Sequence, residues 1–252
     1  MRTMTRKQGF MSIELVKKII EDIRQFPETL KELVPSAWGE TTLYKDWVQV
    51  LELVSLRLPR TGIVFPTNGT LLGDGKVDLL CRIPTLRLVN LSVNAYLPST
   101  YEYFHKLSAD NLKVIENVAA RIRELRPDVR LWVSMVNDPS IQSPREVDLF
   151  KEHWSKYGGV QISTPSYNNR PDRAPKIPVT IPCRSIFSDI VVSWTGVVSS
   201  CCFDANIEIP LGGANKKSLL DIWHGREFVE LRERHNSGNR AYIALCKSCT
   251  FS

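Results

Sequence analysis

The chain has 252 residues, of which 43% are hydrophobic and 24% charged. This length and balance are typical of a globular protein with one large domain, or a medium domain and a small one. The net charge of +6 comes from lysines and arginines spread along the chain. Because they form no dense basic run, a nucleic-acid partner is not favoured.

No apolar run approaches the roughly 18 residues of a membrane helix, and residues 1–12 lack the apolar stretch of a signal peptide. We therefore expect a cytoplasmic protein with no membrane partner. Thiols stay reduced in the cytoplasm, so clustered cysteines there indicate metal ligands rather than disulfides.

The first two thirds of the chain alternate predicted helices and strands. Apolar residues at helical spacing, with Ser12 as N-cap, predict a helix over 12–26. Further helices are expected at 45–57, 74–82, 98–126 (with a break near 108–110) and 144–156. Strands are expected at 62–66, 86–93, 129–136 and 160–164. This alternation predicts an α/β fold in which helices cover a parallel sheet.

Small polar residues stand at the ends of these strands and in the turns that follow. In a parallel sheet the loops at the carboxyl ends of the strands meet at one edge, where ligands bind. The residues expected at this edge are Gly39, Glu40, Thr67, Asn68, Ser92, Asn94, Ser134 and Ser163. Such a row suits a small ligand with several functional groups.

The composition changes over residues 168–182, where prolines and polar residues indicate a linker. We therefore predict a boundary near residue 172, between domains over 1–172 and 173–252. Beyond it, residues 186–193 and 197–200 are expected to form a hairpin around Trp194-Thr195-Gly196. Ser218 and Asp221 form a capping box that opens a helix running to about Arg234.

Five of the six cysteines lie in the last third of the chain, at Cys183, Cys201, Cys202, Cys246 and Cys249. The hairpin brings the first three together, and Cys246 and Cys249 form a Cys-x-x-Cys turn. Four thiolates hold either a tetrahedral zinc ion or a four-iron cluster, and the spacing does not distinguish them. The alternative is a set of buried free thiols.

The two neighbouring cysteines are not expected to bind one centre together. We favour Cys201 as the ligand, with Cys202 as the alternative. Cys81 lies alone on a predicted helix, where it is expected to be a small core residue.

Residues 183–252 resemble the SPASM domain that follows many radical S-adenosylmethionine (radical SAM) barrels. The resemblance rests on the cysteine pattern and hairpin, Phe203-Asp204, Leu219-Leu-Asp-Ile-Trp223-His-Gly and Leu231-Arg232. It is closest to the short form with one auxiliary [4Fe–4S] cluster, which implies the ligands Cys183, Cys201, Cys246 and Cys249. Asp204, two residues after Cys202, is a candidate catalytic base near this cluster.

The first 170 residues are similar to the radical SAM barrel, which implies a partial (β/α)6 TIM-like barrel lacking its first strand. Gly39-Glu40 looks like the family's Gly-Glu-Pro segment, which meets the amino group of S-adenosylmethionine, with Thr41 in place of proline. Thr67-Asn68-Gly69-Thr70 matches the third-strand ending. Ser92 and Asn94 take the fourth-strand positions used towards the ribose, with Asn where Asp is commoner.

The family holds its catalytic cluster on a Cys-x-x-x-Cys-x-x-Cys loop, and the first 80 residues here contain no cysteine. Residues 5–12 look like the segment that follows this loop, so we expect the chain to be truncated at its N-terminus. The explanation that we favour is a gene model that starts late; the other is a remnant that has lost its first strand. The chain as given is expected to be inactive by the family's usual route.

The sequence is consistent with three candidate functions. The resemblance implies a radical SAM enzyme, whose 5′-deoxyadenosyl radical abstracts hydrogen from a peptide, protein or small-molecule substrate. Its electron donor would be a flavodoxin or ferredoxin. The second is a non-catalytic iron–sulfur protein. The third, a zinc module on nucleic acid, is least favoured because basic and aromatic residues are not interleaved in any compact stretch.

Overall fold

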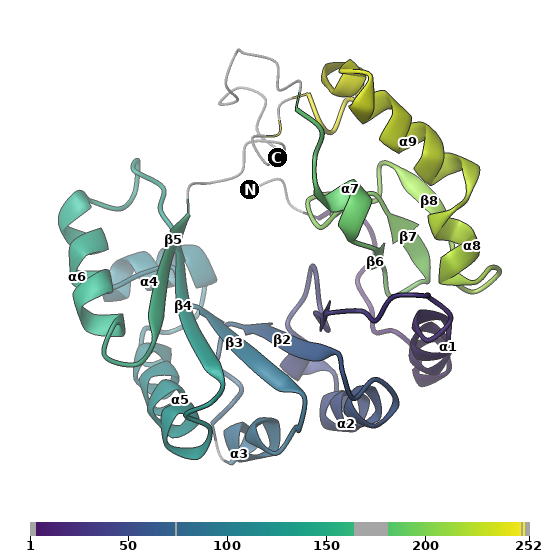
Figure 1. Ribbon diagram of the computed structural model, residues 1–252. Coiled ribbons are helices and arrows are strands. Elements are labelled where there is room, and N and C mark those ends of the chain that lie inside the picture. Colours follow the sequence, from purple (N-terminus) through teal and green to yellow (C-terminus); the bar gives the residue numbers. More distant parts are fainter. Residues whose placement is uncertain (1–3, 74, 164–180, 248, 250–252) are drawn as a thin grey trace. The chain divides into compact units, whose positions relative to one another are not determined.

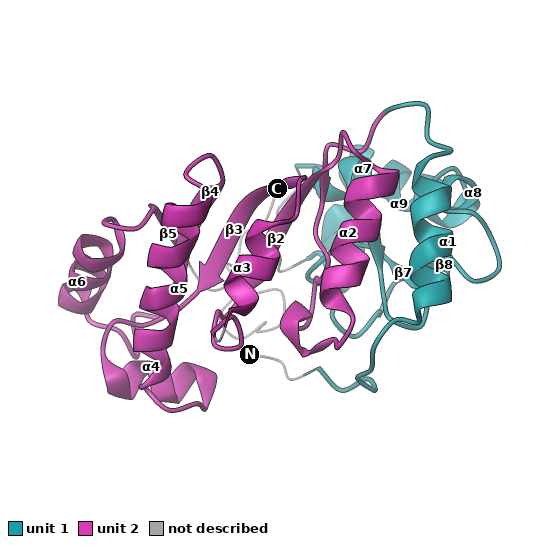
Figure 2. Ribbon diagram, turned by 90° about the horizontal axis from the view of Figure 1, so that it is seen from below, with its two compact units in different colours: residues 1–28, 166–252 teal, residues 29–165 magenta. Residues whose placement is uncertain are grey.

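The computed structural model describes residues 4–73, 75–163, 181–247 and 249. The chain divides into two compact units, one of residues 1–28 and 166–252 and one of residues 29–165 (Figure 2). No helix within the described ranges is long and apolar enough to cross a membrane. The domain boundary predicted near residue 172 lies outside the described residues and stays a prediction.

The unit of residues 29–165 is built on a parallel sheet of five strands in chain order. The strands are β1 (Glu32–Leu33), β2 (Gly62–Thr67), β3 (Leu86–Ser92), β4 (Arg130–Val136) and β5 (Gly159–Ser163). The connecting helices are η1 (Thr41–Leu43), α2 (Trp47–Arg57), α3 (Lys76–Cys81), α4 (Pro98–His105), α5 (Asn111–Leu125) and α6 (Pro144–Trp154). In Figure 1 the long helices of this unit lie on one side of the sheet, which confirms the predicted α/β class.

The predicted strands match the structure to within one residue at each end. The helical region expected at 98–126 is two helices, and the break comes where it was predicted. Lys106 ends α4 with a left-handed φ of 56°, and α5 begins at Asn111. The sequence did not predict β1, because two residues are too few to show an alternating pattern.

The two faces of this sheet differ in character. Phe65, Val89 and Leu131 lie side by side in register and are buried. The neighbouring row on the opposite face contains Asn90 and Trp132, and Trp132 is 39% exposed. Neighbouring residues of a strand point to opposite faces, so one face of the sheet is the core and the other is partly polar.

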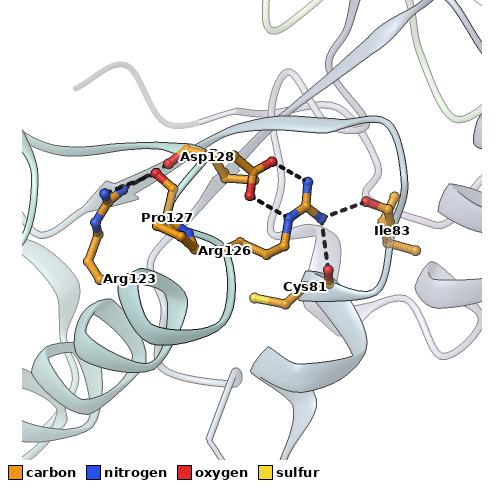
Figure 3. Close-up of polar contacts among 7 residues, drawn as sticks. Cys81, Ile83, Arg123, Arg126, Pro127 and Asp128 are labelled. Atoms are coloured by element: carbon orange, nitrogen blue, oxygen red, sulfur yellow. Dashed lines mark hydrogen bonds and ion pairs between the residues drawn. The ribbon is translucent and has the colours of Figure 1, made fainter.

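Arg126 fixes the carboxyl end of α3 against the chain that follows α5 (Figure 3). Its Nη1 donates to the carbonyl oxygens of Cys81 at 2.9 Å and Ile83 at 3.2 Å, and its Nε and Nη2 pair with Asp128 at 2.9 Å. The last carbonyls of a helix have no partner within the helix, so this arginine satisfies them. Burial raises the pKa of the Cys81 thiol, which is a core residue as predicted.

The other unit contains an antiparallel sheet of β6 (Val191–Val192), β7 (Val197–Ser199) and β8 (Pro210–Gly213). Its helices are α1 (Ile13–Ile23), α7 (Ser185–Ser188), α8 (Leu219–Trp223), α9 (Arg226–Asn236) and η2 (Asn239–Tyr242). The predicted hairpin around Trp194-Thr195-Gly196 is confirmed. Gly196 has a φ of +85°, and a β-carbon there would overlap the side chain of Asn215.

Two expectations for this unit are wrong in detail. Residues 185–188 form the helix α7 rather than the start of a strand, because Ile186 turns into the core of the unit. The helix expected from Ser218 to Arg234 is two helices separated at His224-Gly225. Gly225 is extended (ψ 159°), and glycine is a poor helix former. The predicted cap is confirmed, since Ser218 Oγ accepts the Asp221 N–H.

The N-terminal helix α1 belongs to the same unit as the C-terminal residues and packs beside α8 (Figure 2). Leu15, Ile19 and Ile23 pack against its apolar core. Asp22, which is 4% exposed, accepts the backbone N–H of Leu219 at 3.0 Å. The sequence shows that this helix has an apolar face but does not show what covers it.

Replacing Asp22 should loosen this packing. In Asp22→Ala the Leu219 N–H loses its acceptor in a buried place, so we expect the free energy of unfolding to fall by about 1–3 kcal/mol. Urea unfolding followed by circular dichroism measures it. The matched control is Glu21→Ala, whose ion pair with Arg24 is half exposed and should cost less than about 0.5 kcal/mol. Equal effects of the two changes would show that Asp22 does not hold α1 in place.

Candidate functional site

Four thiols from three separate segments line one cavity in the C-terminal part of the chain. Cys183 precedes α7, Cys201 follows β7, and Cys246 and Cys249 follow η2. Cys202, the neighbour of Cys201, is exposed and does not line this cavity. The structure therefore brings together the four residues named from the sequence and separates the two members of the adjacent pair.

The cavity around these cysteines is mostly apolar. Its other lining residues are Ser185, Ile186, Ser200, Phe203, Leu231, His235, Arg240 and Leu245. Burial raises the pKa of Cys201 to about 12 and that of Cys246 to about 11. Without a metal both thiols therefore carry their protons at neutral pH, and a metal centre has to displace these protons in order to bind.

The thiols line the cavity without meeting at one point. Among the residues that the structure describes, no three His, Cys, Asp or Glu side chains are close enough to share one metal ion. In a tetrahedral zinc site with Zn–S bonds of about 2.3 Å, the sulfur atoms lie only about 3.8 Å apart. In a [4Fe–4S] cluster each cysteine binds a different iron, so the sulfur atoms are farther apart.

Two basic side chains also line this cavity. His235 on α9 is 0% exposed, and its Nδ1 accepts the backbone N–H of Cys183 at 3.2 Å. Burial and the charges of Arg240 and Arg234 lower the pKa of His235 to about 4, so its ring is neutral. Arg240 is 1% exposed and donates to the carbonyl oxygens of Ile181 at 2.8 Å and Cys249 at 3.4 Å.

Asp204 organises the loop that carries Cys201. The carboxylate is 1% exposed and accepts hydrogen bonds from the hydroxyls of Ser199 and Ser200. It also accepts the backbone N–H groups of Glu208 at 2.7 Å and Ile209 at 3.1 Å. These four contacts give Asp204 a structural role in this loop. Its role as a catalytic base stays a prediction.

A second cluster of predicted residues lies in the unit of residues 29–165, at the carboxyl end of β2. Glu40 Oε1 accepts from Thr42 N and Oγ1 and from Thr67 Oγ1 at 3.0 Å. Glu40 Oε2 accepts the Asn68 N–H at 2.8 Å. A carboxylate has about four acceptor positions on its two oxygens, so Oε2 can accept one more donor. A β-carbon at the neighbouring Gly39 would meet no atom within 4 Å.

Two further predicted residues, Ser92 and Asn94, lie at the end of β3. Ser92 lies opposite Ser134 of β4 in the sheet. Asn94 has a left-handed φ of 60°, which asparagine adopts more readily than most residues, and its Oδ1 accepts the Val136 N–H at 2.9 Å. Its side chain therefore joins the ends of β3 and β4.

The sequence did not single out His235 or Arg240. A signal for His235 was present, because Phe228, Leu231 and His235 follow helical spacing on the buried face of α9. A histidine in an apolar stripe needs a polar partner, which is a reason to examine it. Arg240 lies in a short turn after the helix, where no periodic pattern indicates burial.

Residues 183–250 match the family model of SPASM, described as an iron–sulfur cluster-binding domain. This match covers the region that holds the four thiols. Curated protein sequences give no match. Residues 183–250 are therefore similar to the SPASM domain, as the sequence predicted.

Solved structures resemble nearly the whole chain. One of anSMEcpe with bound AdoMet and the Cp18Cys peptide has a TM-score of 0.69 and 12% identity, covering 98% of this chain and 83% of that one. One of BtrN in complex with AdoMet and 2-DOIA has a TM-score of 0.59 and 17% identity, covering 97% and 82%. Both structures share the arrangement of this chain, so the predicted α/β barrel-type fold is confirmed.

The hydrogen bonds of Glu40 should stabilise the folded chain, in addition to any role of this residue in binding a ligand. In Glu40→Gln one oxygen becomes an NH2 group, which cannot accept from Thr42, Thr67 or Asn68. We expect the free energy of unfolding to fall by about 1–3 kcal/mol in thermal or urea unfolding. Glu52→Gln on the exposed side of α2 is the matched control and should change it by less than about 0.5 kcal/mol. A Glu40 variant as stable as this control would contradict the network.

Proposed function

We propose, for this chain with a SPASM domain and a radical SAM-type fold, that the C-terminal domain holds an auxiliary [4Fe–4S] cluster. Its ligands are Cys183, Cys201, Cys246 and Cys249. The observation that carries the proposal is that these four thiols, and not Cys202, line one cavity within the SPASM match. Reduced thiols are required, which supports the cytoplasm as the location.

Two features of the cavity support a cluster rather than a zinc ion. Among the described residues no three ligand-type side chains meet where a single ion would sit, and four thiols on the wall of one cavity suit a larger centre. A [4Fe–4S] cluster with four thiolates is an anion, and the buried guanidinium of Arg240 lines the same cavity. The positive charge of this guanidinium makes the cavity wall complementary to an anionic centre.

We propose that S-adenosylmethionine binds at the carboxyl edge of the parallel sheet, through the residues matched to the family. The free acceptor position of Glu40 Oε2 suits the ammonium group of its methionine part. Gly39 leaves space beside that carboxylate. Thr67 and Asn68 hold Glu40 in place, and Ser92 and Asn94 are assigned to the ribose by the resemblance.

The resemblance implies hydrogen abstraction from a substrate, for which S-adenosylmethionine would supply the radical and the auxiliary cluster would supply an electron acceptor or a substrate-binding site. The protein's own part is to bind and orient these groups and to exclude water. The similar structures hold different ligands, 2-DOIA in BtrN and a peptide in anSMEcpe. The shared fold therefore does not indicate which class of substrate this chain would bind. A flavodoxin or ferredoxin is proposed as the electron donor.

One sequence observation favours a second function. The six cysteines of the chain contain no Cys-x-x-x-Cys-x-x-Cys pattern. A protein that keeps the auxiliary cluster without cleaving S-adenosylmethionine fits this pattern. The two functions share the SPASM cluster and differ in the fate of S-adenosylmethionine.

The cysteine assignment predicts a distinct iron content for each variant. The reconstituted wild type should hold about four irons per chain and absorb broadly in the visible range. Alanine at Cys183, Cys201, Cys246 or Cys249 should lower the iron content and change the electron paramagnetic resonance signal of the reduced cluster. Iron analysis and spectroscopy measure both.

Cys202→Ala is the matched control, since Cys202 adjoins Cys201 but lies outside the cavity. It should keep the wild-type iron content, as should Cys81→Ala. One zinc ion per chain and no iron would overturn the cluster. Loss of iron in Cys202→Ala but not in Cys201→Ala would exchange the two assignments.

The S-adenosylmethionine site predicts binding without cleavage in the 252-residue chain. Isothermal titration should detect binding to the wild type and at least tenfold weaker binding to Glu40→Gln, because the amide no longer pairs with the ammonium group. Glu52→Gln should bind like the wild type. No 5′-deoxyadenosine should be released. Equal affinities of the wild type and Glu40→Gln would remove Glu40 from the site.

A further inference from the structure

We infer that His235 donates a hydrogen bond from its Nε2–H to a sulfur atom of the SPASM cluster or of one of its cysteine ligands. It thereby acts as a positioning residue that sets the cluster's reduction potential. This inference rests on the proposed cluster and assigns a role to a residue of the cavity wall that binds no iron.

The hydrogen bond at the other ring nitrogen fixes the tautomer of His235. Its Nδ1 accepts the backbone N–H of Cys183 at 3.2 Å, so Nδ1 carries no proton. A ring whose Nδ1 accepts a hydrogen bond has no proton at that atom and is therefore neutral. A neutral imidazole with an unprotonated Nδ1 carries its proton on Nε2.

This Nε2–H is buried and has no hydrogen-bond partner among the described residues. The side chain is 0% exposed and lines the same cavity as the four thiols. A buried N–H without an acceptor costs about 1–3 kcal/mol, so such a group is expected to meet an acceptor in the working protein. The sulfur atoms of the cluster and its thiolates are acceptors that would occupy this cavity.

The same geometry argues against His235 as an iron ligand. To bind iron, Nε2 would have to lose its proton, and a neutral ring would then carry the proton on Nδ1. Nδ1 would then point a hydrogen at the backbone N–H of Cys183, and two donors would face each other. His235 is therefore a donor to the cluster, held by the backbone of the first cysteine ligand.

A donor to sulfur favours the reduced cluster, because reduction adds negative charge to the sulfur atoms. Hydrogen bonds to sulfur are among the factors that set the potential of iron–sulfur clusters. Removing the donor should therefore make the reduction potential more negative while the four thiolates continue to hold the iron.

The test uses the full 252-residue chain, reconstituted with iron and sulfide and titrated redox-potentiometrically with detection by electron paramagnetic resonance. His235→Asn keeps an acceptor near the Nδ1 position and removes the Nε2 donor. His235→Gln places an amide N–H near Nε2. We expect a more negative potential in the Asn variant, a potential nearer the wild type in the Gln variant, and full iron content in both. His224→Asn, on an exposed histidine of the same unit, is the matched control.

A second measurement does not depend on the folding of a variant. In wild-type protein labelled with ¹⁵N-histidine, the reduced cluster should show a weak nitrogen hyperfine coupling of the kind that passes through a hydrogen bond. A strong coupling from directly bound nitrogen, or no coupling at all, would overturn the donor role. So would an unchanged potential in His235→Asn with full iron. Wild-type protein that holds no iron would overturn the proposed cluster itself, which separates the two failures.

Discussion

The SPASM region depends on apolar surface that it cannot supply from its own sequence segment. Its sheet has three strands of two to four residues, and a region of this size buries too little surface for a firm core by itself. Helix α1 adds Leu15, Ile19 and Ile23 to that core, and Asp22 caps the first N–H of α8. The proposed cluster adds a second stabilising element, as metals do in many small domains.

The parallel-sheet unit meets a different constraint, because its binding edge is made of loops that need fixed shapes. Glu40 joins the loop after β1 to the end of β2, and Asn94 joins the ends of β3 and β4. Glu40 accepts from hydroxyl and backbone N–H groups and Asn94 from a backbone N–H, so hydrogen bonds link the loops of this edge. The residues proposed to bind a ligand therefore also hold the loops of this edge together.

The sequence predicted those features that depend on local pattern or on residue chemistry. The strands β2 to β5, the cap at Ser218, the turn at Gly196 and the four thiols belong to this group. The two-residue strand β1 and the break at Gly225 are short or marginal, so no periodic signal marks them. What covers α1, and where His235 lies relative to the thiols, depends on contacts between distant segments. Such contacts follow from the whole fold and not from any window of sequence.

The pairing of α1 with α8 has a consequence for synthesis. Asp22 and Leu219 are 197 positions apart, so the ribosome makes the first helix long before its partner exists. The sheet of residues 29–165 is complete in the meantime and pairs only strands that are neighbours in the chain, which favours its early folding. The contacts between α1 and α8 can therefore form only after residues 219–223 have been synthesised.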